Sequence, residues 1–322
     1  MSHELNMQNG KASMAYVGDT PWHGLGQKLT EAATIDDWKR EAGMSYTIKP
    51  AQMTATAEGL SSPIHVPNKV ALYRDDTEEV LGVVGSRYKV VQPEEVLEFF
   101  QDLVEERGFV LDTAGVLFNG SKYWAMARTP HELRMDNDMV KEHLLLATAC
   151  DGSLATTARY VRTRVVCNNT IQAAMGEDRG RSPIIRVEHR STFDATAVKK
   201  ELQLLDESWK EFTDTAQRLA DRRVSYEEAA RYFIDVYGDL ELPMAEQSSK
   251  IPEETYMNFI TNNYLGSDLI AAQGTAWGLL NVVTERVDWH TGKVQDRRLK
   301  SAWLGKGAEL KMTAYLKAKK LL

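Results

Sequence analysis

The spacing of apolar residues changes near residue 109, from that of a helix to that of strands. Between Pro93 and Gly108 the apolar positions fall on one helix face: Val96, Phe99, Phe100 and Leu103. Pro93 suits a first helical turn, and Glu94 and Glu95 suit the positive end of a helix dipole. The pattern predicts a helix that ends at Gly108 and covers a sheet with its apolar face.

Four short apolar runs follow this helix, separated by turn-forming pairs. The runs cover residues 109–118, 122–128, 140–149 and 154–166, and the pairs are Asn119-Gly120, Thr129-Pro130 and Asp151-Gly152. Asn-Gly and Asp-Gly favour tight hairpins because these residues tolerate positive φ. The sequence therefore predicts an antiparallel meander. A short helix is then predicted, with its N-cap region at Asn168-Asn169-Thr170 and continuing through Ile171 and Ala174.

The first ninety residues show weaker periodicity. Residues 1–33 are rich in turn formers, which predicts an ordered, packed loop. A short helix is predicted from an N-cap at Thr34 to Gly43. Strands are predicted at 45–57, 68–73 and 80–91.

Helical spacing returns at Phe193 and continues to the end of the chain. One long amphipathic helix is predicted from Phe193 to Leu219, and Ser225 with Glu228 forms a capping box for the next. Further helices are predicted at 225–236, 252–263, 271–287 and 306–320, with a turn at 288–293. The chain is thus predicted to be α+β, with an antiparallel β-meander packed against helices and a helical C-terminal region. The predicted domains are 1–190 and 191–322.

Composition narrows the class of protein. No run approaches the ~20 apolar residues of a membrane span, and the first residues lack the pattern of a secretory signal. Only Cys150 and Cys167 are present, which excludes a disulfide framework and a four-cysteine zinc site. No phosphate-binding loop is recognisable, so no cofactor is expected. A cytoplasmic protein without a membrane partner is the expectation.

Charge is uneven although its net value is −7. Acidic residues dominate from 75 to 106, and bases outnumber acids from 159 to 200. Within the basic region, strand alternation would place Tyr160, Arg162 and Arg164 on one face. Arginines around an aromatic ring are typical of a groove for single-stranded nucleic acid, in which cations contact phosphates and rings stack on bases. The alternative is a strand edge that charges protect from aggregation.

The full candidate nucleic-acid interface adds neighbouring residues to this face. Its members are Arg159, Tyr160, Arg162, Arg164, Asn168, Asn169, Lys122 and Trp124. The arginines would neutralise phosphates, and the two asparagines could donate hydrogen bonds at the start of the predicted helix. The two cysteines are predicted to be buried and inert, and the glutamate pairs near 94 and 105 to lie on a solvated helix face. No metal-binding spacing and no catalytic residue is identified.

Several motifs resemble one family. They are Thr20-Pro21-Trp22-His23-Gly24-Leu25-Gly26, Asp151-Gly152-Ser153, the segment from Thr163 to Thr170, the segment from Thr275 to Asn281, and Asp288-Trp289-His290. Together they resemble the phage/plasmid-like family of domain of unknown function 932, which implies a mobile-element setting and no agreed catalytic residues. The order of helix, meander and helix also resembles the core of single-strand annealing proteins, which implies ATP-independent, oligomeric binding of single-stranded DNA.

The sequence thus favours a protein that binds and anneals single-stranded DNA as a homo-oligomer during phage or plasmid replication or recombination. Two alternatives stay open. One is a metal-dependent nuclease or nucleotide-modifying enzyme that uses His23 and Asp151. The other is a phage protein that binds and inhibits a host protein, which would need an exposed apolar patch.

Overall fold

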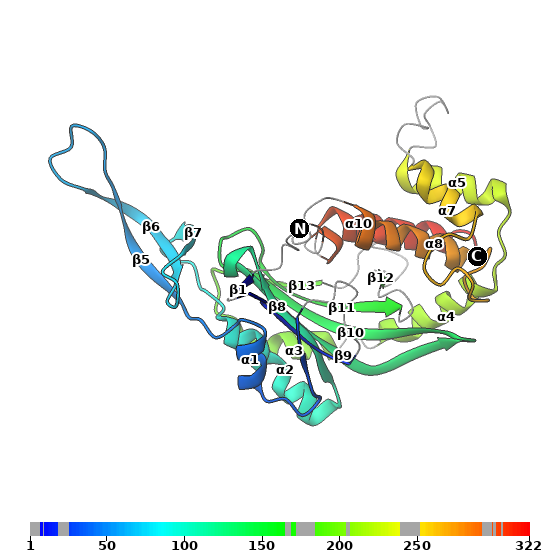
Figure 1. Ribbon diagram of the computed structural model, residues 1–322, viewed down its shortest axis with the longest axis horizontal. Coiled ribbons are helices and arrows are strands. Elements are labelled where there is room, and N and C mark those ends of the chain that lie inside the picture. The colour runs from blue at the N-terminus through cyan, green and yellow to red at the C-terminus, as the bar shows by residue number, and fades with distance from the viewer. Residues whose placement is uncertain are drawn as a thin grey trace. The chain divides into compact units, whose positions relative to one another are not determined.

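The chain folds into two compact units that interleave along the sequence (Figure 1). The computed structural model describes residues 7–8, 10–18, 26–164, 169–171, 184–203, 207–238, 252–291, 298, 301–303 and 305–322. Unit 1 comprises residues 1–130, 144–159 and 184–202, and unit 2 comprises 131–143, 160–183 and 203–322. The domain boundary predicted near residue 190 stays a prediction. Three strands of the meander, β9, β10 and β11, each contribute residues to both units.

An antiparallel meander is the centre of the main sheet, which confirms the predicted α+β class. Its strands run in the order β12-β11-β10-β9-β8-β3-β4, and β13 also pairs with β11. Their bounds are β3 Met14–Val17, β4 Gln27–Leu29, β8 Val110–Leu117, β9 Lys122–Met135, β10 Asp138–Ala149, β11 Thr156–Arg164, β12 Asn169–Ile171 and β13 Ile184–Val187. A further two-stranded sheet pairs β1 Met7–Gln8 with β2 Lys11–Ala12.

Three local predictions for this sheet were wrong. The turn at Thr129-Pro130 is absent, because β9 continues to Met135. Pro130 is tolerated there since pairing between β8 and β9 ends at Val110–Arg128, so no β8 neighbour needs its missing N–H. The predicted helix at 168–174 is a strand over 169–171, where β-branched Thr170 and Ile171 favour extended backbone. The predicted N-terminal loop contains β3 and β4.

Two predicted helices of unit 1 are confirmed. Helix α1 (Ile35–Glu41) begins at Thr34, whose hydroxyl accepts a hydrogen bond from the N–H of Asp37. Helix α2 (Pro93–Arg107) ends at Gly108, which has a φ of 67°. The predicted apolar face of α2 is buried, and α2 packs against both α1 and β8. Helix α3 (Ala195–Gln203) adds Lys199, whose amine lies 5.3 Å from the ring centroid of Phe99.

A second sheet of unit 1 consists of β5 (Ile48–Ala55), β6 (Ile64–Arg74) and β7 (Val80–Gly85), with β6 in the centre. Figure 1 shows the far ends of β5 and β6 extending away from the other elements of this unit. The near end of the sheet is attached where β7 approaches the turn after β10. A Cβ atom on Gly82 would lie only 2.9 Å from the Cα of Asp151.

Unit 2 has a helical core. Its helices are α4 Glu207–Asp221, α5 Tyr226–Tyr237, α7 Glu253–Ile260, α8 Ala276–Glu285 and α10 Lys306–Lys319. The predicted capping box of Ser225 and Glu228 is present at α5. The helix predicted from Phe193 to Leu219 is described as α3 and α4, and the stripe of α4 is buried in this core, so it offers no surface for oligomerisation. The turn predicted from Asp288 is helical as far as His290.

The family motif at 275–281 has a packing role in this core. Thr275 caps α8 by accepting a hydrogen bond from the N–H of Gly278. Trp277 is fully buried, and its indole N–H donates to Asp138 at 3.1 Å. Gly278 is required by space, since a Cβ there would lie 2.0 Å from the carbonyl oxygen of Ala272. Within the described residues, no helix is long and apolar enough to cross a membrane.

The approach of Gly82 to Asp151 makes a testable prediction. Replacing Gly82 by Ala should lower the free energy of unfolding by about 1–3 kcal/mol, because a backbone atom has to move to admit the methyl group. Gly85→Ala in the same strand is the matched control, since nothing lies within 4 Å of its added Cβ. Urea unfolding of both variants checks this, and equal stabilities would show that the approach is not a constraint.

Candidate functional site

The predicted nucleic-acid face of β11 is enclosed in the structure. Arg159, Tyr160 and Arg162 are 3%, 8% and 1% exposed, and Val161 between them is 1% exposed. Alternation along a strand leaves one face in water only where that face is uncovered, and the guanidinium of Arg162 lies over the ring of Phe212 on α4. The expectation that Tyr160 and Arg162 project into solvent was therefore wrong.

Arg162 takes part in a buried charge network of unit 2. Its Nη2 lies 2.9 Å from Oε1 of Glu142, whose other oxygen lies 2.9 Å from Nδ1 of His131. The His131 ring stacks on Trp209, and the guanidinium of Arg162 lies 5.4 Å from the ring centroid of Phe212. Burial lowers the pKa of Arg162, and the Glu142 carboxylate opposes that shift. The arginine thus compensates an interior carboxylate.

The neighbouring candidates on β9 are also buried. Lys122 is 7% exposed, forms an ion pair with Asp151 and lies 4.8 Å from the ring centroid of Phe118. Trp124 is 3% exposed. Burial by itself would raise the pKa of Asp151, but hydrogen bonds from Lys122 and Ser153 bring it below its usual value. Asp151 therefore holds a turn, since the N–H of Ser153 donates to its Oδ1 at 2.9 Å.

Of the other candidate residues singled out in the sequence, Cys150 lies in the core and the rest lie, wholly or by their side chains, outside the described residues. Cys150 is buried, as predicted, and burial raises the pKa of its thiol to about 12. The side chains of Arg164 and Asn169, together with Asn168, Cys167 and His23, lie outside the described residues. Among the described side chains, no cluster of three or more His, Cys, Asp or Glu could hold a metal ion.

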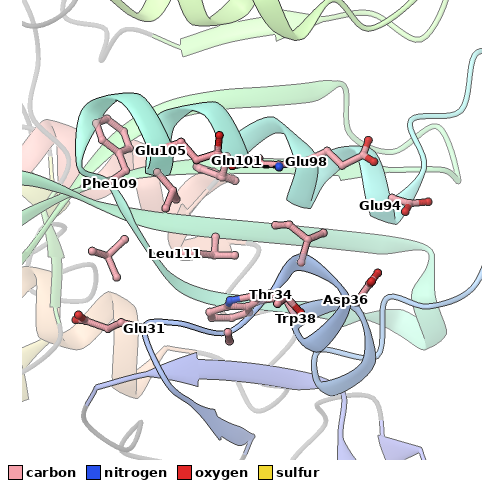
Figure 2. Close-up of a pocket in the computed structure, with 15 residues that line it drawn as sticks. Glu31, Thr34, Asp36, Trp38, Glu94, Glu98, Gln101, Glu105, Phe109 and Leu111 are labelled. Atoms are coloured by element: carbon pink, nitrogen blue, oxygen red, sulfur yellow. Dashed lines mark hydrogen bonds between the residues drawn. The ribbon is translucent and has the colours of Figure 1, made fainter.

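A pocket of about 600 Å³ lies in unit 1 between α1, α2 and β8 (Figure 2). Its apolar floor is formed by Trp38, Phe100, Phe109 and Leu111, each less than a tenth exposed. Its rim carries five carboxylates and no lysine or arginine: Glu31, Asp36, Glu94, Glu98 and Glu105. Figure 2 shows Glu94, Glu98, Gln101 and Glu105 following one another along α2. Their spacing places them on one helix face.

Bases outside the pocket neutralise part of this rim. Lys39 Nζ lies 2.6 Å from Glu94 and 3.8 Å from Asp36, which raises the pKa of Lys39 through its hydrogen bond to Glu94. Arg128 lies 3.1 Å from Glu31. Glu98 and Glu105 are exposed, and no base within the described part of the chain forms an ion pair with either. The pocket thus combines an apolar floor with an acidic rim, and the charge of Glu98 also contributes to the raised pKa of Lys39.

Sequence reasoning placed the α2 glutamates on a solvated face and assigned them no chemistry. That face is solvated, but α1 lies beside α2 and converts it into one wall of a pocket. The available signal was the repeat of acidic residues at 94, 98 and 105 beside apolar Phe100 and Val104. The contact between α1 and α2 joins segments that are far apart in the sequence, since Lys39 and Glu94 are separated by 55 residues, and no local pattern encodes it.

The comparisons with known proteins give one match. A family model described as "Domain of unknown function (DUF932)" matches residues 80–303, which is more than half of the chain. No curated protein and no solved structure matches. The comparisons therefore support the first resemblance and do not show a likeness to annealing proteins.

The network around Arg162 predicts how its replacement acts. Arg162→Ala should lower the free energy of unfolding by about 3–5 kcal/mol, because Glu142 would remain buried without its cation. Arg134→Ala is the control in the same unit, since Arg134 pairs with Glu132 at the surface and should cost only about 0–1 kcal/mol. Chemical denaturation measures both. Equal losses for the two variants would contradict the interior role of Arg162.

Proposed function

The chain belongs to the DUF932 family, whose name assigns no activity, and we propose from its own site that it is a binding protein whose pocket receives an extended basic segment of another polypeptide. The observation that carries this proposal is the pocket's apolar floor beneath a rim of carboxylates without a basic lining residue. A cation is attracted by such a rim, and apolar side chains gain by leaving water at such a floor.

The row of glutamates on α2 forms an acidic wall of the pocket, and the length of this wall favours a polypeptide ligand over a small cation. Glu94 and Glu105 are eleven residues apart on α2, which corresponds to about 16 Å at 1.5 Å per residue. An extended segment of five residues covers about the same length. Alternate side chains of that segment point to one side, so its bases and apolar residues could meet the wall and the floor together.

This function is of the same kind as one alternative that the sequence left open, a protein that acts by binding another protein. Apolar contact at the floor would supply affinity, whereas the carboxylates would select basic segments and reject acidic ones. Exposed Val104, which is 39% accessible beside the glutamates of α2, extends the apolar surface to the rim. A host protein is one such partner in the mobile-element setting that the family resemblance implies.

Single-stranded DNA binding is a second candidate, and one observation favours it. Helix α2 precedes strands β8 to β11, which are neighbours in sequence order, as the first two elements of the resemblance to annealing proteins require, whereas the closing helix is replaced by strand β12. The buried arginines would not reach phosphates without rearrangement of β11. The proposal therefore depends on Arg164, Asn168 and the basic residues that follow them, including Arg179 and Arg181.

The pocket proposal is tested with a short blocked peptide in which two lysines flank valine and tyrosine. We expect the double variant Glu98→Gln, Glu105→Gln to bind it about 2- to 30-fold more weakly, since each exposed ion pair contributes about 0.2–1 kcal/mol. Fluorescence anisotropy of the labelled peptide measures this. Glu188→Gln removes an exposed carboxylate of the same unit outside the pocket and should leave affinity unchanged. Equal binding of a glutamate version of the peptide would contradict the proposal.

The DNA proposal is tested by the salt dependence of binding to an unstructured oligonucleotide. Arg164→Ala should reduce the slope of log affinity against log salt by about 0.7, the value for one phosphate contact on a single strand. Lys141→Ala, which removes a partly exposed base of β10, serves as the control. A protein that shows no binding at ~50 mM salt, where such contacts are strong, would exclude this function.

A further inference from the structure

The sheet formed by β5, β6 and β7 has two apolar faces, and only one of them is buried. Residues opposite each other in an antiparallel pair share a face. One face contains Ile48 paired with Arg74, together with Leu72 and Val84, and all four are 5% exposed or less. This face is the one that packs within unit 1.

The opposite face carries apolar side chains where a solvated antiparallel sheet would carry polar ones. Ala51 is paired with Ala71 and Ala71 with Val83, and Tyr73 is paired with Val80. Val80 is 59% exposed and Val83 is 48% exposed. Both belong to β7, which pairs only with β6 among the described strands. An exposed patch of this kind marks a surface for contact with another molecule.

Two lysines lie on the same face as this patch. Lys49 is paired with Tyr73, and Lys69 is paired with Gly85 at the other end of the ladder. Lys49 is half exposed and lies 3.3 Å from Asp75, whereas Lys69 is exposed. We call this surface the ribbon face, consisting of Lys49, Ala51, Lys69, Ala71, Tyr73, Val80 and Val83.

We propose that the ribbon face of one copy of this chain docks in the acidic pocket of a second copy. This inference rests on the proposed function and names its partner. The two surfaces are complementary in kind: lysines beside an apolar patch on one, and carboxylates above an apolar floor on the other. They are also complementary in length. Four residues of β6 separate the positions of the two lysines, or about 13 Å, and Glu98 and Glu105 are about 10 Å apart on α2.

The assembly that follows is head-to-tail. The pocket and the ribbon face are different surfaces of unit 1, so each copy would offer one of each. Such a contact is heterologous, and it continues from copy to copy until a ring closes or a filament grows. Lys69 would contact Glu98 or Glu105, and Val83 and Tyr73 would cover the pocket floor.

The test uses two variants of the full chain. The ribbon variant is Lys69→Glu with Val83→Glu, and the pocket variant is Glu98→Lys with Glu105→Lys. All four residues are exposed, and circular dichroism and thermal unfolding should match the unmodified protein. Like charges facing each other at an interface are strongly unfavourable, so each variant alone should self-associate at least about tenfold more weakly. Sedimentation velocity from about 1 µM to 1 mM covers tight and weak association.

Mixing the two variants gives the decisive result. The pocket variant keeps its ribbon face and the ribbon variant keeps its pocket, so the mixture should associate again through these two unmodified surfaces. Ile270→Glu, which changes an apolar side chain that is 61% exposed in unit 2, should associate like the unmodified protein. The inference is overturned if the unmodified protein is monomeric throughout, if either variant associates normally, or if the mixture stays monomeric.

Binding of the lysine peptide separates this inference from the proposed function. The ribbon variant should bind the peptide with unchanged affinity, and the pocket variant should bind it at least about tenfold more weakly. If the ribbon variant binds the peptide but the unmodified protein does not self-associate, the pocket function stands and the second copy is not its partner. If the mixture associates only in the absence of peptide, the peptide and the ribbon face compete for one pocket, as proposed.

Discussion

Burial of the apolar face of α2 determines which of its side chains remain available to a ligand. Phe99 and Phe100 are 1% exposed or less, and each such ring contributes about 1.5–3 kcal/mol by leaving water. With that side of the helix fixed inside, Glu94, Glu98 and Glu105 have to lie on the other side. The acidic wall of the pocket is thus a consequence of the core, and a change in the core stripe would rotate or displace the wall.

Arginines inside the sheet impose a different constraint, since a buried cation needs a partner. The interior pair of Arg162 and Glu142 contributes little net stability, but the loss of either member would leave a charge without compensation. The pair therefore restricts the register of β10 and β11, because a shift of one strand by one residue would place the two charges on opposite faces of the sheet. This restriction on register accounts for the presence of Arg162 at a strand position that the sequence pattern alone would place in water.

Local features were readable from the sequence, and long-range ones were not. The Thr34 cap, the ends of α2 at Pro93 and Gly108, and the meander follow from caps, periodicity and turn residues. The burial of β11 could not be predicted. Alternation shows which residues of a strand share a face, but it does not show whether another element covers that face. Short strands such as β4 and β12 depend on partners elsewhere in the chain, and the pocket depends on α1 approaching α2.

The interleaving of the two units has a consequence for synthesis of the chain. Unit 1 acquires its last segment only near residue 202, after parts of unit 2 have already been made. Domains that are contiguous can fold one after another as they leave the ribosome, the N-terminal one first. This chain cannot follow that order, because no early fragment contains a whole unit. Its first strands cannot complete their packing until later segments have been synthesised. Until then their apolar surface stays exposed, and chaperones could bind it.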